Sequence, residues 1–258
     1  MNTYFLTDSH FGAGADSLER ERQMVRFLDS IMPDCERLIL LGDIFEFWFS
    51  YKYVVPKGHV RILGKLAEMI DQGIEIHYFI GNHDMWLFDY LEKEIGLTMH
   101  SDPIDMEIDG RMFHIGHGDG MGYKLTQNRH EKKYIKLKRM FRCRFNQKLF
   151  AMVNPRIGIG IALRWSNSSR KSHGDKYNHY LGDEKEGIVL HCKEKLKEME
   201  YDYFVFGHRH LAMTMPLEIE NRRSVYINVG DWIDHRNYAV FDGKEVAILD
   251  YSEDIKHL

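Results

Sequence analysis

Five short apolar runs, each followed at once by side chains that bind metals or protons, constrain this chain more than any other feature of its sequence. The runs cover Asn2–Thr7, Arg37–Leu41, Glu75–Ile80, Met112–Ile115 and Tyr203–Phe206. They lead into Asp8-Ser9-His10, Gly42-Asp43, Gly81-Asn82-His83-Asp84, Gly116-His117-Gly118-Asp119 and Gly207-His208-Arg209-His210, in that order. Apolar runs of this length that end at glycine or polar residues are typical of buried strands. Because ligands of open α/β sheets bind beyond the carboxyl ends of the strands, we expect the five loops to meet at one place.

The segments between these runs have the spacing of amphipathic helices. Val60, Leu63, Ala67 and Ile70, for example, fall on one face of a helix. Near the end of the chain, Asp242-Gly243 separates two apolar runs and predicts a hairpin. This alternation predicts an α/β fold. With 258 residues, the chain is large for one domain and small for two, and we expect residues 1–258 to form a single domain.

Composition excludes several classes of protein. The 44% hydrophobic and 29% charged residues are ordinary for a globular chain and unlike an intrinsically disordered one. No apolar run approaches the roughly 20 residues needed to span a bilayer, and a strand-like run starts at Asn2, which leaves no room for a signal peptide. The three cysteines, Cys35, Cys143 and Cys192, are widely spaced and predict no disulfide framework. We therefore expect a reduced, cytoplasmic protein.

Residues 124–180 depart from the alternating pattern. From Lys124 to Gly174 there are fourteen Lys and Arg and a single acid, so the segment carries +13 while the rest of the chain carries −17. The segment contains no convincing strand, and apolar residues such as Ile157, Ile161 and Trp165 are spread through it. We interpret it as a helical, basic insertion that covers the predicted site as a lid. Its charge suggests an anionic partner.

The predicted site is rich in nitrogen and oxygen donors and contains no thiolate. The candidates are Asp8, His10, Asp43, Asn82, His117, His208 and His210. Imidazole, carboxylate and amide donors suit Mn, Fe or Zn rather than a structural zinc–cysteine site. Seven donors are too many for one ion, whereas two divalent ions that share a bridging carboxylate accommodate them. Such a pair is suited to the hydrolysis of a phosphoester or phosphoanhydride.

The order of these motifs resembles the calcineurin-like metallophosphoesterase superfamily, and the likeness spans Asp8 to His210. The resemblance implies a β-sandwich flanked by helices. It also implies a division of the ligands, with Asp8, His10 and His210 on one metal, Asn82, His117 and His208 on the other, and Asp43 bridging. His83 and Asp84 would then be the catalytic pair, with Asp84 orienting His83 or a ligand histidine.

Within that superfamily, the chain is most similar to the UDP-2,3-diacylglucosamine pyrophosphatases of lipid A synthesis. The similarity rests on Gly42-Asp43-Ile44-Phe45-Glu46-Phe47-Trp48, on the basic insertion after Gly-His-Gly-Asp, and on Asn167-Ser168-Ser169-Arg170. It implies cleavage of UDP-2,3-diacylglucosamine to UMP and the acylated sugar 1-phosphate, commonly with Mn²⁺, by a peripheral enzyme at the inner face of the cytoplasmic membrane. The substrate contacts expected on this basis are Asn82, His83, Asn167, Arg170, Lys171 and His208.

Two features depart from the family pattern. His83 stands where the pyrophosphatases usually have arginine. In addition, the residues after Gly118, which are Asp119, Gly120, Met121 and Gly122, contain no second acid besides Asp119, although one is expected near the substrate. Histidine suits a general acid, whereas arginine stabilises the charge of a phosphate leaving group. Both roles of His83 stay open, as does a different substrate, such as another nucleotide, a phosphoprotein or a nucleic acid, although we do not expect a nucleic-acid partner. A scaffold without catalysis is the third alternative, but its ligand set should have gaps, and here every position is filled.

Overall fold

Two β-sheets form the centre of the computed structural model, which describes residues 1–126, 129–177 and 179–252, without the side chains of 129–131 and 167–177. The first sheet has the order β11-β10-β1-β2-β3-β4. Its strands are β11 (Val246–Asp250), β10 (Asn237–Phe241), β1 (Asn2–Leu6), β2 (Cys35–Leu40), β3 (Glu75–Phe79) and β4 (Thr98–His100). Strands β1 to β4 are parallel, and β10 pairs with β1 in the antiparallel sense.

The second sheet has the order β5-β6-β7-β9-β8, with β6, β7 and β9 parallel and the two edge strands antiparallel to their neighbours. Its strands are β5 (Ile104–Ile108), β6 (Arg111–Gly116), β7 (Tyr203–Phe206), β9 (Arg222–Asn228) and β8 (Met213–Ile219). Every strand predicted above is present within a few residues of its expected limits. Strands β4, β5 and β8 were not predicted, because their half-exposed edge positions give short or irregular apolar patterns.

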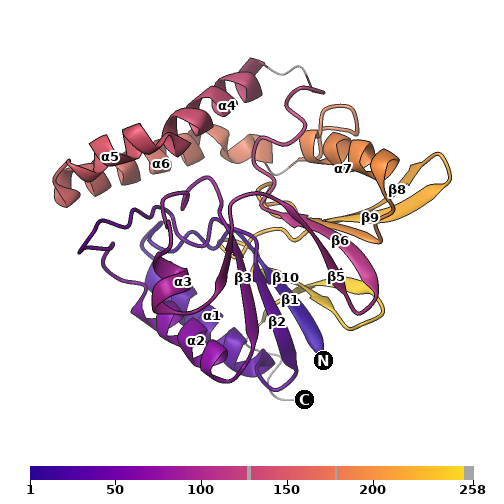
Figure 1. Cartoon of the computed structure of the whole chain (residues 1–258), viewed down its shortest axis with the longest axis horizontal. Helices are drawn as coiled ribbons and strands as arrows, with labels where there is room; N and C mark the ends of the chain where they lie inside the picture. The colour runs from indigo at the N-terminus through magenta and orange to yellow at the C-terminus, as the bar shows by residue number, and fades with distance from the viewer. Residues whose placement is uncertain (127–128, 178, 253–258) are drawn as a thin grey trace.

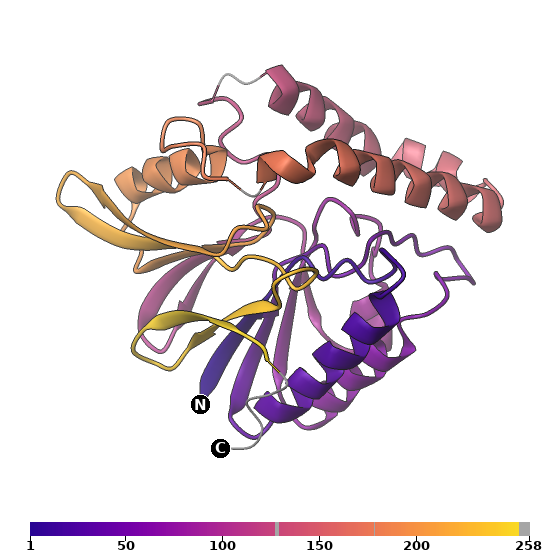
Figure 2. The same ribbon diagram turned by 180° about the vertical axis from the view of Figure 1, so that it is seen from behind.

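The two sheets pack face to face, and helices cover their outer faces (Figures 1 and 2). Phe5 and Phe79 of the first sheet share the inner core with Phe113, Val205 and Ile227 of the second. Helices α1 (Ser17–Ile31), α2 (Val60–Asp71) and α3 (Tyr90–Glu94) lie on the first sheet, and α7 (Gly187–Glu198) lies on the second. The result is the helix-flanked β-sandwich that the sequence led us to expect.

The buried face of α2 lies beside the predicted one, of which Leu63 and Ile70 are half-buried against the core. Ile62, Leu66 and Met69 are buried, whereas Val60 is 77% exposed. The helix carries two apolar series offset by a few residues, and the series that faces the sheet holds the larger side chains. Periodicity showed that the helix is amphipathic, but the packing against α1 and the sheet decided which series is buried.

The basic segment forms three helices, α4 (Arg129–Arg142), α5 (Arg144–Ala151) and α6 (Pro155–Tyr177), which lie together across one end of the sandwich (Figures 1 and 2). Phe150 of α5 packs on Phe49 and Trp86 with ring centroids 4.8 Å away in each case. The Trp86 indole also donates a hydrogen bond to the Phe141 carbonyl on α4 at 2.9 Å. These contacts hold the segment on the core. Among the described residues, no helix has the length and apolar character needed to cross a bilayer.

Candidate metal centre

The five predicted loops meet at the end of the sandwich beneath the α4–α6 segment, but they come from both sheets. Strands β1, β2 and β3 of the first sheet lead to Asp8 and His10, to Asp43, and to Asn82, while β6 and β7 of the second lead to His117 and to His208 and His210. Among the described residues, three groups have one donor atom per residue, all within 4.8 Å of one another. Two of them consist of predicted ligands, namely Asp8, His10 and His210, and Asp43, His117 and His208, while the third joins His10 to Glu46 and His83. The structure thus brings together all the predicted ligands.

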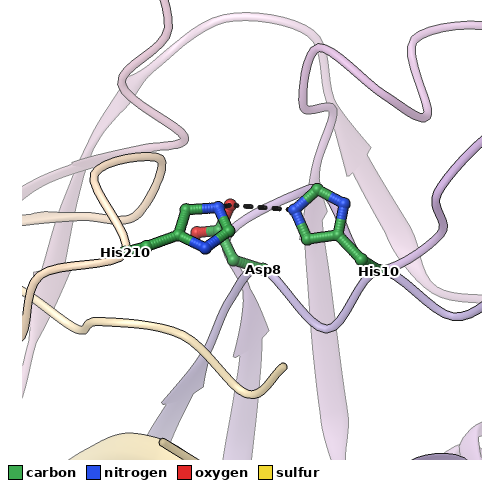
Figure 3. A group of neighbouring side chains, drawn as sticks. All are labelled: Asp8, His10 and His210. Carbon is green, nitrogen blue, oxygen red and sulfur yellow. Dashed lines mark ion pairs between the residues drawn. The ribbon is translucent and has the colours of Figure 1, made fainter. Parts of the chain in front are cut away.

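In the first group, the side chains of Asp8, His10 and His210 converge from the two sheets (Figure 3). The Asp8 Oδ1 atom lies 3.2 Å from His210 Nε2 and 3.7 Å from His10 Nε2. The other carboxylate oxygen of Asp8 accepts hydrogen bonds from the Thr7 hydroxyl at 2.6 Å and the His208 N–H at 2.8 Å. The Oδ2 atom of Asp8 therefore holds the side chain in place, and its Oδ1 atom faces His10 and His210.

In the second group, His117 is oriented by the main chain. Its Nδ1 atom donates to the Leu41 carbonyl at 2.7 Å, which leaves Nε2 3.4 Å from Asp43 Oδ2 and 3.2 Å from Asn82 Oδ1. A backbone partner on one ring nitrogen is the usual way to present the other nitrogen to a metal. Asp43 Oδ2 is also 4.0 Å from His10 Nε2 in the first group. This single oxygen lies between the two groups.

The donor atoms fit divalent ions. Two donors held about 2.1 Å from one ion are roughly 3.0–3.4 Å apart in octahedral or tetrahedral geometry, close to the separations found here. Asp8 Oδ1 and His10 Nε2 are buried without a hydrogen-bond partner. Unpaired buried polar atoms are costly and call for an explanation. A metal ion bound between them would satisfy both.

Five of the predicted ligands adopt a backbone conformation that side chains rarely take. Asp8, His10, Asp43, His208 and His210 all have φ between 46° and 68°. Aspartate and histidine enter this left-handed region more readily than most residues, but each instance is still unfavourable. Such strain is concentrated at functional sites, where the surrounding structure holds it in place. Here it turns the donors of successive loops toward a common centre.

The glycines in these loops serve mainly for close approach. Gly42 has φ of 93°, as a sharp turn requires. By contrast, Gly81 and Gly207 have ordinary φ values, but a Cβ on Gly81 would lie 2.1 Å from Asp43 Oδ1, and one on Gly207 would lie 2.0 Å from Thr7 Oγ1. At Gly42, glycine permits the turn of the backbone. At Gly81 and Gly207, glycine is needed because a neighbouring loop lies so close that a Cβ would overlap its atoms.

The electrostatic field of the site is strongly anionic. Burial alone would lower the pKa of His10, but the nearby Asp8 carboxylate, the hydrogen bond to Glu46 and the charge of Asp43 raise that pKa to about 10. Burial alone would raise the pKa of Asp8, yet the charge of His210 and the proximity of His10 hold it well below the usual value. Clustered carboxylates that favour positive charge on buried imidazoles also favour a metal cation in place of the protons.

The Asp84 carboxylate binds the loops after β2 and β3 and does not orient a histidine. Its carboxylate accepts hydrogen bonds from the N–H groups of Gly81 at 2.9 Å and Ile44 at 3.0 Å and from the Tyr78 hydroxyl at 2.5 Å. The expected contact with His83 or a ligand histidine is not among its hydrogen bonds. Asp84 therefore acts on the positions of the loops after β2 and β3, and a direct catalytic role for it has no support in this geometry.

His83 and Glu46 form a further group next to the first metal-type cluster. The His83 ring stands edge-on to His10 with centroids 4.6 Å apart, and the backbone N–H of His83 donates to Asp43 Oδ1 at 2.7 Å. Glu46 Oε2 lies 2.9 Å from His10 Nδ1. The sequence placed Glu46 in the Gly42–Trp48 motif, at the border of the site, but gave it no role there. Its position three residues after Asp43, in a loop that carries a ligand, was the available signal.

The α4–α6 segment reaches the site through several side chains. Buried Asp119, which follows the ligand His117, pairs with Lys138 of α4 at 2.6 Å and accepts the Tyr134 hydroxyl at 2.5 Å. From α6, Ser166 contacts Glu46 and His83. The expected substrate contacts Asn167, Arg170 and Lys171 also fall on α6, but their side chains lie outside the described part of the structure.

Comparisons with known proteins agree with this geometry. No protein-family profile matches the chain. It is 38% identical to the UDP-2,3-diacylglucosamine hydrolase of Porphyromonas gingivalis (strain ATCC BAA-308 / W83), with 98% of each chain aligned. It is 24% identical to the UDP-2,3-diacylglucosamine hydrolase of Aeromonas salmonicida (strain A449), over 93% of this chain and 89% of that one.

Two solved phosphoesterase structures are among those that align with the chain. An archaeal phosphodiesterase aligns over 97% of this chain and all of that one, with 15% identity and a TM-score of 0.47. The phosphoesterase Yfce of E. coli aligns over 96% and 92% of the two chains, with 12% identity and a TM-score of 0.45. The full-length identity to the Porphyromonas enzyme, together with the ligand set assembled here, shows that the chain belongs to the UDP-2,3-diacylglucosamine hydrolase family.

Proposed function

We propose that the protein is a dinuclear metal-dependent hydrolase that cleaves the diphosphate of UDP-2,3-diacylglucosamine to UMP and 2,3-diacylglucosamine 1-phosphate. The observation that carries this proposal is the position of Asp43 Oδ2, which lies 3.4 Å from His117 Nε2 and 4.0 Å from His10 Nε2. One carboxylate oxygen between two sets of buried donors suits a bridged pair of ions. The full-length relatives that bear this activity in their names supply the substrate.

The ligands fit the following division. Asp8, His10 and His210 would hold one ion, Asn82, His117 and His208 would hold the other, and Asp43 would bridge them. Mn²⁺ is the ion we propose, while Fe and Zn bind the same donors. When bound, such a pair polarises a phosphoryl oxygen and supplies hydroxide from water at neutral pH.

The remaining residues act on the leaving group and the substrate. Water adds to one phosphorus of the diphosphate, the bond from that phosphorus to the bridging oxygen breaks, and the departing phosphate keeps the electron pair. The His83 side chain is 17% exposed, and it is placed to donate a hydrogen bond to that oxygen or to stabilise its charge. We assign further substrate contacts to Asn82 and His208.

A cavity of about 430 Å³ opens beside the second ligand group and gives the substrate room. Its lining includes His117, Asp119 and apolar side chains such as Ile135. Lys138, Arg139 and Arg142 of α4 also line it, and two of them pair with carboxylates, Lys138 with Asp119 and Arg142 with Asp102. A pocket that combines apolar surface with cations suits an anionic substrate with an apolar portion. We propose that Asn167, Arg170 and Lys171 of α6 also contact it.

The apolar residues of α6 divide between two faces, which suggests two roles. Ile159 and Leu163 are half-buried and lie on the same side as Ser166, which reaches the site. Ile157 and Ile161 are 57% and 59% exposed. We propose that the inner face borders the acyl chains of the substrate. The outer face, surrounded by Lys and Arg, would contact the inner surface of the cytoplasmic membrane peripherally.

The test first compares hydrolysis of two substrates and then compares substitutions on the two faces of α6. Purified protein with Mn²⁺ should release UMP from UDP-2,3-diacylglucosamine far faster than it hydrolyses a generic phosphodiester, and Asp43→Ala should abolish both reactions. Turnover of generic esters alone would refute the lipid substrate. Ile159→Asp should impair the diacyl substrate in detergent, whereas Ile161→Asp should act only on vesicle binding. Equal effects of the two variants in both assays would contradict the division into faces.

A further inference from the structure

The Glu46 carboxylate joins a predicted metal ligand to the α4–α6 segment. Glu46 is 1% exposed, and its Oε2 atom lies 2.9 Å from His10 Nδ1. Its Oε1 atom accepts a hydrogen bond from the Ser166 hydroxyl at 2.7 Å. Ser166 is 120 residues further along the chain, on α6. This link therefore exists only while α6 lies on the sandwich.

The same serine also contacts His83, and the count of protons fixes the direction of that hydrogen bond. Ser166 Oγ lies 2.7 Å from His83 Nδ1. A hydroxyl has one proton, and the carboxylate of Glu46 can only accept it, so Ser166 accepts from His83. The Glu46 carbonyl oxygen, another obligate acceptor, lies 3.2 Å from the same ring nitrogen. Both partners require a proton on His83 Nδ1, so His83 can donate to the substrate from Nε2 only when the ring binds a second proton and becomes an imidazolium.

This arrangement leaves Nε2 as the nitrogen of His83 that faces neither of these partners. The two nitrogens of an imidazole lie on different edges of the ring, so a ring clamped at Nδ1 presents Nε2 in a defined direction. The ring is also held edge-on to His10 at 4.6 Å between centroids. A group that exchanges hydrogen bonds or protons with a reacting oxygen must be held within a few tenths of an ångström of its productive position.

We infer that Ser166 is a positioning residue that, through Glu46, fixes the orientation and tautomer of His83 when α6 docks on the core. The helical segment thus completes the catalytic site in addition to covering the substrate. This inference rests on the proposed role of His83 in phosphoanhydride hydrolysis. It assigns to this chain a coupling between closure of the segment and the competence of a catalytic side chain.

The experiment substitutes Ser166 and reads two quantities. Ser166→Ala should lower kcat for UDP-2,3-diacylglucosamine about 10- to 100-fold, part of the effect typical of general acid–base groups, and change KM less than about 2-fold. Ser166→Thr, which keeps the hydroxyl, should recover most of kcat. Asn146→Ala is the matched control, because the hydrogen bond that the Asn146 side chain makes to the described residues is to the Met140 carbonyl, within the same helical segment. This variant should leave kcat unchanged.

The second readout is independent of turnover. Nitrogen-15 NMR of the histidine rings in chelator-treated protein should show His83 protonated at Nδ1 in the wild type and in Ser166→Thr, and a mixture of tautomers in Ser166→Ala. A His83 spectrum unchanged by Ser166→Ala would overturn the inference. So would a loss of kcat that Thr fails to restore and that parallels a drop in melting temperature. If the tautomer shifts as expected but the wild type does not hydrolyse the UDP-lipid, the proposed substrate is wrong and the positioning role stands.

Discussion

Gly81→Ala offers the sharpest test of how this site is built. A Cβ at this position would lie 2.1 Å from Asp43 Oδ1 and 2.4 Å from the Asp43 backbone nitrogen. Because one of these atoms is main chain, rotation of a side chain cannot relieve the clash. The loops after β2 and β3 would have to separate, and Asp43 would leave its place between the two ligand groups.

The magnitude follows from the size of the overlap. Overpacking a tight site typically costs about 1–3 kcal/mol, and a clash with main-chain atoms belongs at the upper end. A loss of about 3 kcal/mol in the free energy of unfolding lowers the melting temperature by roughly 6–12 °C for a chain of this size. A shift of about 1 Å in a catalytic group costs on the order of 100-fold in rate.

Gly64→Ala is the matched control with the opposite expected sign. Gly64 lies on an exposed position within α2, and a Cβ there would meet no atom within 4 Å. Replacing a helical glycine by alanine stabilises a helix by about 1 kcal/mol, so the melting temperature should rise by roughly 2–4 °C.

The assay combines thermal denaturation with and without chelator, calorimetric titration with Mn²⁺, and hydrolysis rates. Gly81→Ala should melt earlier, bind Mn²⁺ weakly and lose at least 100-fold in rate. If Gly81→Ala melts within 2 °C of the wild type and keeps its Mn²⁺ affinity, the close approach of the two loops is not what positions Asp43.

Three further outcomes are expected. Mn²⁺ at 100 times its dissociation constant should stabilise the protein by about 2.7 kcal/mol, because it satisfies Asp8 Oδ1 and His10 Nε2; a melting temperature indifferent to chelator would contradict this. Burial and the neighbouring His114 lower the pKa of His191 to about 4, so the unfolded state binds this proton first as pH falls from 6.5. Up to about 3 kcal/mol of stability should therefore be lost between pH 6.5 and 4, and His191→Gln should show a smaller decline in denaturant titrations. Phe150→Ala should expose α5 to limited proteolysis while the sandwich keeps its melting temperature within a few degrees; uniform destabilisation would show that the helical segment and core unfold together.

The order of elements and the clustering of the candidate donors could be predicted from the sequence because both depend on local patterns. An apolar run that ends in a polar loop specifies a strand and its carboxyl end, whatever its partner. The loops after β1, β2, β3, β6 and β7 were identified in this way, as was the helical, basic character of residues 124–180. The short edge strand β4 and the buried face of α2 were not, because neighbouring elements decide which side of a weak pattern is covered.

The sequence by itself determined which residues supply the donors: Asp8, His10, Asp43 and the asparagine and histidines of the later loops. Only the tertiary structure decided which of the two sheets supplies each donor, that Asp84 binds main-chain N–H groups, and that Glu46 and Ser166 join His10 to His83. The physical reason is the distance along the chain over which each kind of interaction acts. Residue type and spacing act over a few positions along the chain, whereas a hydrogen bond between residues 120 positions apart depends on how separate layers pack.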